Sequence, residues 1–213
     1  MRTSSDSTST SSSSYDECTW LEAFLHKSEL EDLLTPVPMT YFQESLSLYG
    51  LEQEIDYFRE ALQLIVDNTY DCEEGDVEKV ERAAAILYAK AHQRYIKTAQ
   101  ALEEVRTNYQ NGTYGECPRL SCQGQHLLPF GPSADPGKEI LRFYCPCCRE
   151  CYKMYQINAD MYVDGCFFGP DLVGIFMASY PEFAQQVPKR EYVPRVYGFE
   201  LYRNVLGKRR GRQ

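Results

Sequence analysis

The chain has 213 residues, includes 17 Tyr and 10 Phe, and carries a formal net charge of -9. Its length suggests one large domain or two small ones, and its aromatic content is sufficient to bury a core. The acidic balance argues against broad binding to a nucleic-acid backbone, which needs Lys and Arg to displace counterions, and favours a protein partner.

The chain contains nine cysteines, an odd number that cannot all pair within one chain. The N-terminal residues are polar and show neither a basic region nor an apolar stretch, so we predict no signal peptide. The longest apolar runs, such as Leu172–Ala178, are far too short to cross a bilayer, so no membrane association is expected. Inside a cell thiols stay reduced, and clustered cysteines bind metal more often than they form disulfides.

Residues 1–17 form a tail that is rich in Ser, Thr and Asp. Such a segment has nothing to bury and is predicted to be disordered. Residues 18–114 are predicted to form a helical domain, because apolar side chains recur there at the spacing of helix faces. The expected helices run from Trp20 to the stop at Thr35-Pro36-Val37-Pro38, over about 40–49 with Gly50 behind it, from about Ile55 to Asp67, from Asp76 as N-cap to about Tyr95, and over about 98–110 before Asn111-Gly112.

The composition changes at Gly115, where Cys, Pro, Gly and aromatic residues become dense. Short strand-like runs such as Glu139–Tyr144 replace the helical periodicity. We therefore predict a second, β-rich domain over residues 115–202, followed by a basic tail at 203–213. The expected fold class is α+β.

The strongest chemical signal is a set of four cysteines. Cys117 and Cys122 enclose four residues, Cys145 and Cys148 enclose two, and 22 residues separate the pairs. This spacing is typical of a tetrahedral zinc ribbon, in which each pair lies on a tight turn and the intervening hairpin brings the turns together. Four thiolates leave no open position, so we expect one structural Zn2+ per chain whose binding energy stabilises the fold.

The second pair can be chosen in two ways, since Cys148 and Cys151 also enclose two residues and Cys147 is an extra neighbour. We favour Cys145 and Cys148 because the prolyl step after Cys145 suits a turn. Cys147 and Cys151 are then expected to be surface or interface thiols. The plain alternative for the whole set is a group of buried free thiols.

Motifs of catalysis are missing from the sequence. It contains no phosphate-binding loop, no G-x-S-x-G, no H-E-x-x-H and none of the protein-kinase signatures, so we expect no enzymatic activity. His126 is the one histidine near the cysteines and is expected to be a surface residue rather than a fifth ligand.

Several distinctive segments follow one another along the chain. They are Asn108–Arg119, Leu127–Gly131, Tyr144–Pro146, Asp164–Gly169 and Tyr192–Phe199, preceded by Arg94-Tyr95-Ile96 in the helical part. In order and spacing these segments resemble the casein kinase II beta-subunit family. The resemblance spans residues 18–202 and is specific, because a ribbon, a D-G-x-x-F-G turn and a V-P-R-x-Y-G-F segment occur together.

The resemblance implies a non-catalytic regulatory subunit of a serine/threonine kinase. Such a subunit has a helical N-terminal domain, dimerises through its zinc ribbon, binds catalytic subunits through an extended C-terminal segment, and so modulates their stability, activity and substrate choice. The implied location is cytoplasmic and nuclear. The implied residues are the ligands Cys117, Cys122, Cys145 and Cys148, the dimer contacts Pro118, Leu120 and Cys151, and the docking anchors Val196, Tyr197 and Phe199.

The chain also departs from the family pattern. Its acidic loop at Glu73, Glu74 and Asp76 is shorter and less charged than is typical, and Ser121 replaces an aromatic residue. Glu200 and Tyr202 occupy positions where basic residues are usual. We therefore expect a specialised member whose affinity for the catalytic subunit is altered.

The N-terminal tail carries a candidate modification site. Ser13 and Ser14 have Asp16 and Glu17 three residues further on, which resembles the acidic context that casein kinase II prefers. Phosphorylation would add charge to the tail, and an unmodified solvated linker is the alternative.

Two other functions compete with a kinase regulator. A nucleic-acid-binding zinc ribbon would need a basic face, but the basic residues between 117 and 153 are partly offset by acidic ones, which leaves Lys208–Arg212 as a weak phosphate contact or nuclear-localisation signal. A zinc enzyme or thiol oxidoreductase would need a metal with an open position or an isolated reactive cysteine pair.

Overall fold

The structure is a computed structural model and describes residues 18–27, 30–31, 33–71, 74–153, 163–184 and 195–200. The α-helices are α1 Trp20–Lys27, α2 Met39–Gln43, α3 Leu51–Glu54, α4 Phe58–Asp67, α5 Val77–Tyr95, α6 Ala99–Asn111 and α7 Leu172–Ser179. Short 3-10 helices are η1 Glu74–Asp76, η2 Leu120–Cys122, η3 Gly165–Phe167 and η4 Pro181–Ala184. The strands are β1 Leu128–Phe130, β2 Arg142–Tyr144, β3 Cys151–Tyr152, β4 Arg195–Val196 and β5 Phe199–Glu200.

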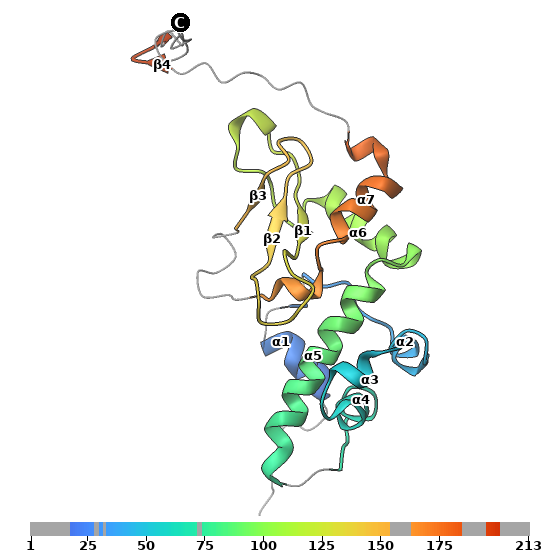
Figure 1. Ribbon diagram of the computed structural model, residues 1–213. Helices are drawn as coiled ribbons and strands as arrows, with labels where there is room; N and C mark the ends of the chain where they lie inside the picture. The colour runs from blue at the N-terminus through green and yellow to red at the C-terminus, as the bar shows by residue number, and fades with distance from the viewer. Residues whose placement is uncertain are drawn as a thin grey trace, which may run out of the picture.

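Helix α5 is the central element of the helical part, with α1 to α4 packed around it (Figure 1). Its face toward α4 buries side chains that are four or three residues apart, among them Val80, Ala84, Leu87 and Ala91. Helix α6 begins at Thr98, whose hydroxyl accepts a bond from the Ala101 amide, and it ends at Gly112 in the left-handed conformation. The helices predicted from the sequence are present, although several of their ends differ. The ends of α6 lie within a residue of the prediction.

The turn after α2 differs from the prediction. The helix expected to reach residue 49 ends at Gln43, and Gly50 precedes α3 instead of closing a longer α2. Arg94 explains the early end, because its guanidinium donates to the carbonyls of Ser47, at 3.1 Å, and Tyr49, at 2.9 Å. The carbonyls of Ser47 and Tyr49 are therefore held in a turn by Arg94 of α5. A local sequence pattern cannot show this contact, because its partners are distant in the chain.

One expectation about a helix end is corrected, and one about a helix start is confirmed in position but without a capping bond. The first helix ends at Lys27 rather than near Leu34, although Leu30, Leu33 and Leu34 are buried as predicted. Asp76 occupies the N-cap position of α5 but makes no capping bond, since its carboxylate pairs with the Lys79 ammonium at 2.6 Å. Of the acidic loop, Glu73 lies outside the described residues and Glu74 begins η1.

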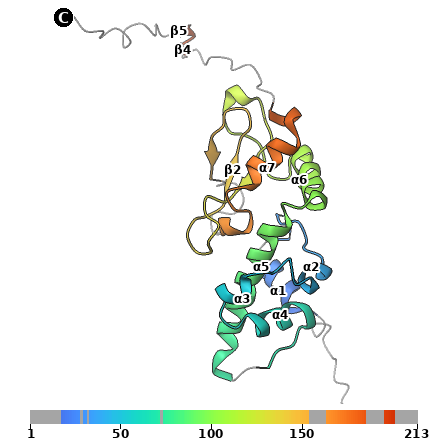
Figure 2. The ribbon, with the colours of Figure 1, turned by 45° about the vertical axis from the view of Figure 1, so that its right-hand side comes forward.

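The second half contains a three-stranded antiparallel sheet in the order β1-β2-β3. Leu128 pairs with Tyr144, Phe130 with Arg142, and Tyr144 with Cys151. The strand-like run predicted over Glu139–Tyr144 forms a strand from Arg142 to Tyr144. Figures 1 and 2 show the sheet at the end of the molecule opposite α3 and α4.

Helix α7 was not expected as a helix. Its residues are the apolar run that is too short to cross a bilayer, and they bury Leu172 and Phe176. The Phe176 ring packs edge-on against Tyr109 of α6, with centroids 5.5 Å apart, and stacks on Phe183. The run is therefore apolar because it covers the sheet and α6 (Figure 2). Within the described residues, no helix combines the length and the apolarity needed to cross a bilayer.

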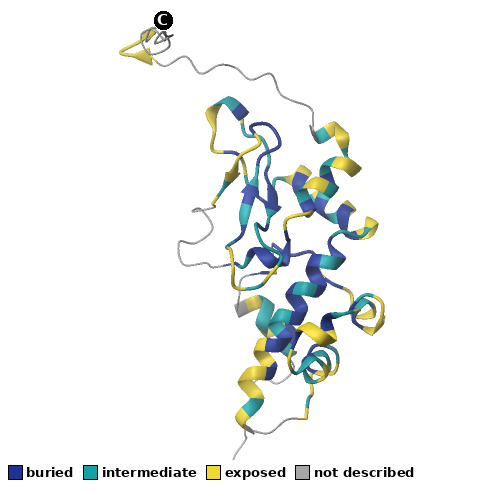
Figure 3. Ribbon diagram, viewed as in Figure 1, coloured by how far each residue is buried: buried dark blue, intermediate teal, exposed yellow. Residues whose placement is uncertain are grey.

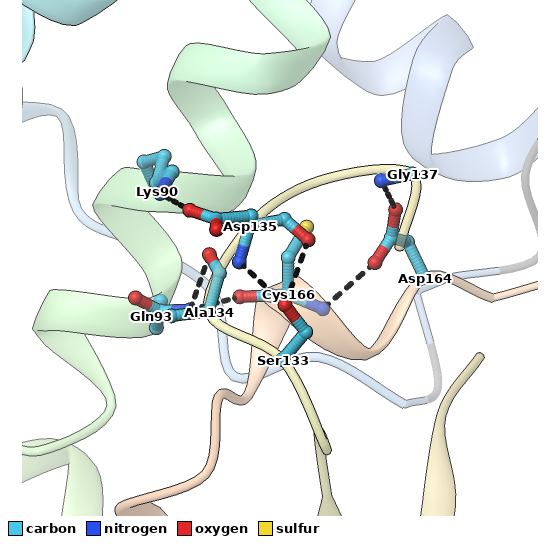
Figure 4. A network of polar contacts seen from close by, with 8 residues as sticks. All are labelled: Lys90, Gln93, Ser133, Ala134, Asp135, Gly137, Asp164 and Cys166. Atoms are coloured by element: carbon cyan, nitrogen blue, oxygen red, sulfur yellow. Dashed lines mark hydrogen bonds and ion pairs between the residues drawn. The ribbon is translucent and has the colours of Figure 1, made fainter. Parts of the chain in front are cut away.

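One continuous core joins the helical part to the sheet part, as the buried stretch along α5 shows (Figure 3). The Gln93 side chain of α5 donates to the carbonyls of Cys166, at 2.7 Å, and Ala134, at 3.2 Å. Lys90, one turn earlier in α5, pairs with Asp135 at 3.4 Å (Figure 4). The boundary between domains at residue 115 stays a prediction, and a large interface connects the two sides of it.

His92 lies at the centre of this interface, and its burial leads us to expect that the stability of the fold falls at acidic pH. It is completely buried, and its Nδ1 lies 2.7 Å from the Phe167 carbonyl oxygen. Burial lowers its pKa to about 4. Because the unfolded side chain takes up a proton near pH 6.5 and the folded one does not, stability is lost as the pH falls from about 6.5 to about 4, by about 3 kcal/mol.

Denaturant titrations at pH 7 and pH 5 measure this effect. We expect the wild type to lose more stability between these values than His92→Gln, which can still donate to Phe167 but has no group that titrates here. A matched change at exposed His26, His26→Gln, should leave the difference intact. Equal losses in wild type and His92→Gln would contradict the assignment.

Candidate metal centre

Four thiols come together at the end of the sheet. Cys117 precedes η2 and Cys122 is the last residue of η2, whereas Cys145 and Cys148 lie in the turn between β2 and β3. Their sulfur atoms all lie within 4.8 Å of one another, and the four residues are buried or nearly so. The sequence pattern therefore identified the pairs that the fold assembles.

Each pair is held by a tight turn of the main chain. The Cys117 amide bonds to the Gln125 carbonyl at 2.7 Å, and Gln123 and Gly124 between them adopt left-handed conformations. In the second turn the Arg149 amide bonds to the Cys145 carbonyl at 2.8 Å, with Arg149 itself at a φ of 61°. These turns leave the cysteine side chains on the inside, facing one another.

The dimensions of the cluster fit a tetrahedral thiolate metal. The Cys117 and Cys148 sulfur atoms are 3.9 Å apart. A zinc–sulfur bond of ~2.3 Å in a tetrahedron places neighbouring sulfurs ~3.8 Å apart. Among the described residues, this is the group of Cys, His, Asp and Glu side chains with the spacing to hold a metal ion.

The electrostatics of the cluster also favour a bound cation. Burial raises the pKa of the Cys117, Cys122 and Cys145 thiols, so without a cation they hold their protons. Burial also acts on Cys148, but hydrogen bonds from the Tyr152 hydroxyl and the Glu150 amide lower its pKa to about 7. A divalent cation would replace the protons and offset the charge of the buried thiolates.

The remaining cysteines near the cluster stay outside it. Cys151 is exposed on β3, whereas Cys147 is buried within the chain, which corrects the expectation that it is a surface or interface thiol. His126 is half-buried with its ring edge-on to Tyr109, at a centroid distance of 6.1 Å, and does not join the four sulfurs. Cys166 is buried beside α5, Cys18 is exposed, and Cys72 lies outside the described residues.

One neighbour of the cluster was not predicted from the sequence. The Tyr152 hydroxyl lies 3.1 Å from the Cys148 sulfur. The Cys148 thiolate also raises the pKa of the exposed Arg119 guanidinium. Cysteine spacing gave no signal for this contact, because it depends on the register that pairs Phe143 of β2 with Tyr152 of β3.

The residues expected at the dimer contact lie beside the cluster. Pro118 and Cys151 are exposed, and Leu120 is 84% exposed at the start of η2. The Leu120 side chain is therefore accessible to another molecule.

The residues expected to dock on a partner lie on the hairpin β4–β5. Val196 pairs with Phe199 across the hairpin, and Tyr197 occupies the turn with a φ of 51°. Tyr197 is 97% and Phe199 79% exposed. Glu200 pairs with Arg195 at 2.6 Å, whereas Tyr202, Ser13 and Ser14 lie outside the described residues.

A helical body joined to a small sheet that assembles four cysteine thiols defines an α+β protein with a ribbon-type four-cysteine metal site. The family model of the casein kinase II regulatory subunit matches residues 19–200. This chain belongs to that family.

Named relatives agree with the family model. The chain is 33% identical over 209 residues to the putative casein kinase II subunit beta-4 of Arabidopsis thaliana, covering 94% of this chain and 71% of the relative. It is 34% identical to casein kinase II subunit beta-2 of Schizosaccharomyces pombe, covering 90% and 76%. It is 32% identical to casein kinase II subunit beta' of Drosophila melanogaster, covering 88% and 85%.

Proposed function

We propose that this chain is a non-catalytic regulatory subunit that dimerises through its ribbon and binds casein kinase II catalytic subunits, giving a tetramer with two catalytic chains. Membership of the regulatory-subunit family supports the class. The observation that carries the proposal is the β4–β5 hairpin, which presents Val196, Tyr197 and Phe199 to solvent. Aromatic side chains exposed on a hairpin turn are compact anchors of the kind that dominate interface energies.

The metal in this proposal is one structural Zn2+ per chain. The cysteines that would hold it are Cys117, Cys122, Cys145 and Cys148. When bound, zinc supplies folding energy and no open coordination position for chemistry. The chain's own contribution is to set the two turns so that the ribbon keeps a fixed shape.

The fixed ribbon presents the proposed dimer face. Pro118 and Leu120 lie between Cys117 and Cys122, and Cys151 lies on β3 just after the second turn, so their relative positions depend on the closed cluster. A Leu120 side chain that inserts into the partner chain would bury apolar area now in contact with water. We further propose phosphorylation at Ser13 and Ser14, and a cytoplasmic and nuclear location.

Replacing the hairpin aromatics tests the docking assignment. We expect Tyr197→Ala combined with Phe199→Ala to weaken binding of the catalytic subunit by ~1,000-fold, since hot-spot truncations cost about 2 kcal/mol or more each and every 1.4 kcal/mol is tenfold. Calorimetry or surface plasmon resonance with purified catalytic subunit measures the change. Zinc content and thermal unfolding should match the wild type, because both side chains are exposed.

Tyr49→Ala is the matched control, because Tyr49 is 80% exposed but lies on the turn after α2. It should leave the affinity unchanged. Unchanged affinity in the hairpin double variant would show that docking uses another surface. Nucleic-acid binding is less favoured, since Arg142 in the ribbon is already paired with Glu139 at 3.0 Å.

A further inference from the structure

Tyr152 approaches the cysteine cluster from outside the ligand set. Its hydroxyl oxygen lies 3.1 Å from the Cys148 sulfur. The described hydrogen bonds include no other side-chain hydroxyl on any of the four cluster sulfurs. Among the described hydrogen bonds of the cluster sulfurs, the one with a neutral hydroxyl is therefore on Cys148.

The direction of this hydrogen bond follows from the proposed metal. A thiol could donate to the phenol oxygen, but a metal-bound sulfur has lost its proton and can only accept. The Tyr152 hydroxyl must then be the donor. A hydrogen bond to a charged acceptor is about twice as strong as one between neutral groups.

Charge balance gives this donor a role. Four thiolates around one divalent cation carry a net charge of about -2 in a buried site. Hydrogen bonds that point at the sulfurs spread this charge and stabilise the ligands, as outer partners of metal sites commonly do.

The position of Tyr152 connects the cluster to the edge of the sheet. Strand β3 has two residues, and it is held by the pairs Phe143 with Tyr152 and Tyr144 with Cys151. So short an edge strand is weak by itself. The hydrogen bond between the Tyr152 hydroxyl and the Cys148 sulfur adds a side-chain contact across the turn between β2 and β3. Cys151, the other residue of β3, is exposed.

We propose that Tyr152 is a positioning residue for the metal, whose hydroxyl donates a hydrogen bond to the metal-bound Cys148 sulfur and holds strand β3 against the closed cluster. The inference rests on the proposed zinc site and deepens it. Metal occupancy then orders the strand that carries Cys151, a residue of the proposed dimer face.

Removing only the hydroxyl tests the inference. The full-length chain is loaded with Zn2+ and titrated with a chromogenic chelator, as wild type and as Tyr152→Phe. We expect Tyr152→Phe to bind one zinc per chain with an affinity 10- to 100-fold lower, the range typical for loss of an outer partner. Tyr144→Phe on β2 is the matched control, since the described hydrogen bonds place no cluster sulfur on the Tyr144 hydroxyl, and it should leave the affinity unchanged.

Cobalt provides a readout that a purely structural role would not move. In the Co2+-loaded chain the sulfur-to-cobalt charge-transfer band should shift in Tyr152→Phe and stay in place in Tyr144→Phe. Substituting Tyr152 with 3-fluorotyrosine, a stronger hydrogen-bond donor, should shift the band in the opposite direction. The Cys151 and Tyr152 amides should exchange faster with solvent in Tyr152→Phe, because β3 is held less firmly.

The outcomes separate this inference from the proposed function. Zinc at one per chain with unchanged affinity and an unchanged cobalt spectrum in Tyr152→Phe would overturn the role of Tyr152 and leave the zinc site intact. A wild-type chain that folds without metal would overturn both. If Tyr152→Phe failed to fold, the 3-fluorotyrosine chain would decide, since an unshifted band there also rejects the hydrogen bond.

Discussion

Replacing Cys145 with serine is expected to abolish metal retention and unfold the ribbon. Cys145 is completely buried, and its sulfur is one of the four in the cluster. Structural zinc supplies ~10–16 kcal/mol of apparent binding energy in small zinc modules, as much as the stability of a whole domain. We expect the zinc content of Cys145→Ser to fall close to zero and the sheet residues to lose protection against hydrogen exchange.

Cys147→Ser is the matched control, because Cys147 is also buried and lies two residues from Cys145 but outside the cluster. It should retain zinc and lose at most modest stability. Cys148→Ser and Cys151→Ser extend the comparison to the other choice of pair, and only the first should release the metal. Full zinc content in Cys145→Ser, measured by atomic emission, would refute the assignment of the ligands.

Gly131→Ala is expected to cause the largest loss of stability among changes away from the cysteines. A Cβ atom at this position would lie 1.8 Å from the Gly165 carbonyl oxygen and 2.7 Å from the Gly169 nitrogen. All the opposing atoms belong to the backbone, so no side chain can move aside. We expect a loss of at least about 3 kcal/mol, the upper end for overpacking, and a melting temperature lower by about 6–12 °C.

The expected loss of stability is large because the contact between Gly131 and η3 is part of the interface with α5. The Gly131 amide bonds to the Gly169 carbonyl at 3.2 Å, and the neighbouring segment bonds to α5 through Ala134 and Asp135 (Figure 4). Separating Gly131 from η3 would therefore also loosen the contact between the sheet and α5.

Gly174→Ala is a control with the opposite sign. A Cβ at Gly174 in α7 meets nothing within 4 Å, and alanine favours a helix interior by ~0.8–1.0 kcal/mol. Thermal unfolding should show a small increase. Equal melting temperatures for Gly131→Ala and the wild type would show that the two glycine segments are not packed as described.

The metal cluster illustrates what cysteine spacing can and cannot predict. The pairs Cys117 with Cys122 and Cys145 with Cys148 were chosen from spacing and from a proline after Cys145, and the fold brings these four sulfurs together. The same pattern gave no indication that Cys147 is buried or that Tyr152 reaches Cys148. Those positions depend on the register between β2 and β3, which is set by pairing rather than by spacing.

The sequence alone determined the fold class, the family and the succession of helices before a cysteine-rich sheet. These properties follow from local patterns, because periodic apolar residues define helix faces and paired cysteines define metal-binding turns. Only the tertiary structure decided that α2 ends at Gln43, that residues 172–179 form a helix, and that His92 and Gln93 join α5 to η3. Each of these depends on a partner distant in the chain, whose hydrogen bonds or apolar surface outweigh the local preference.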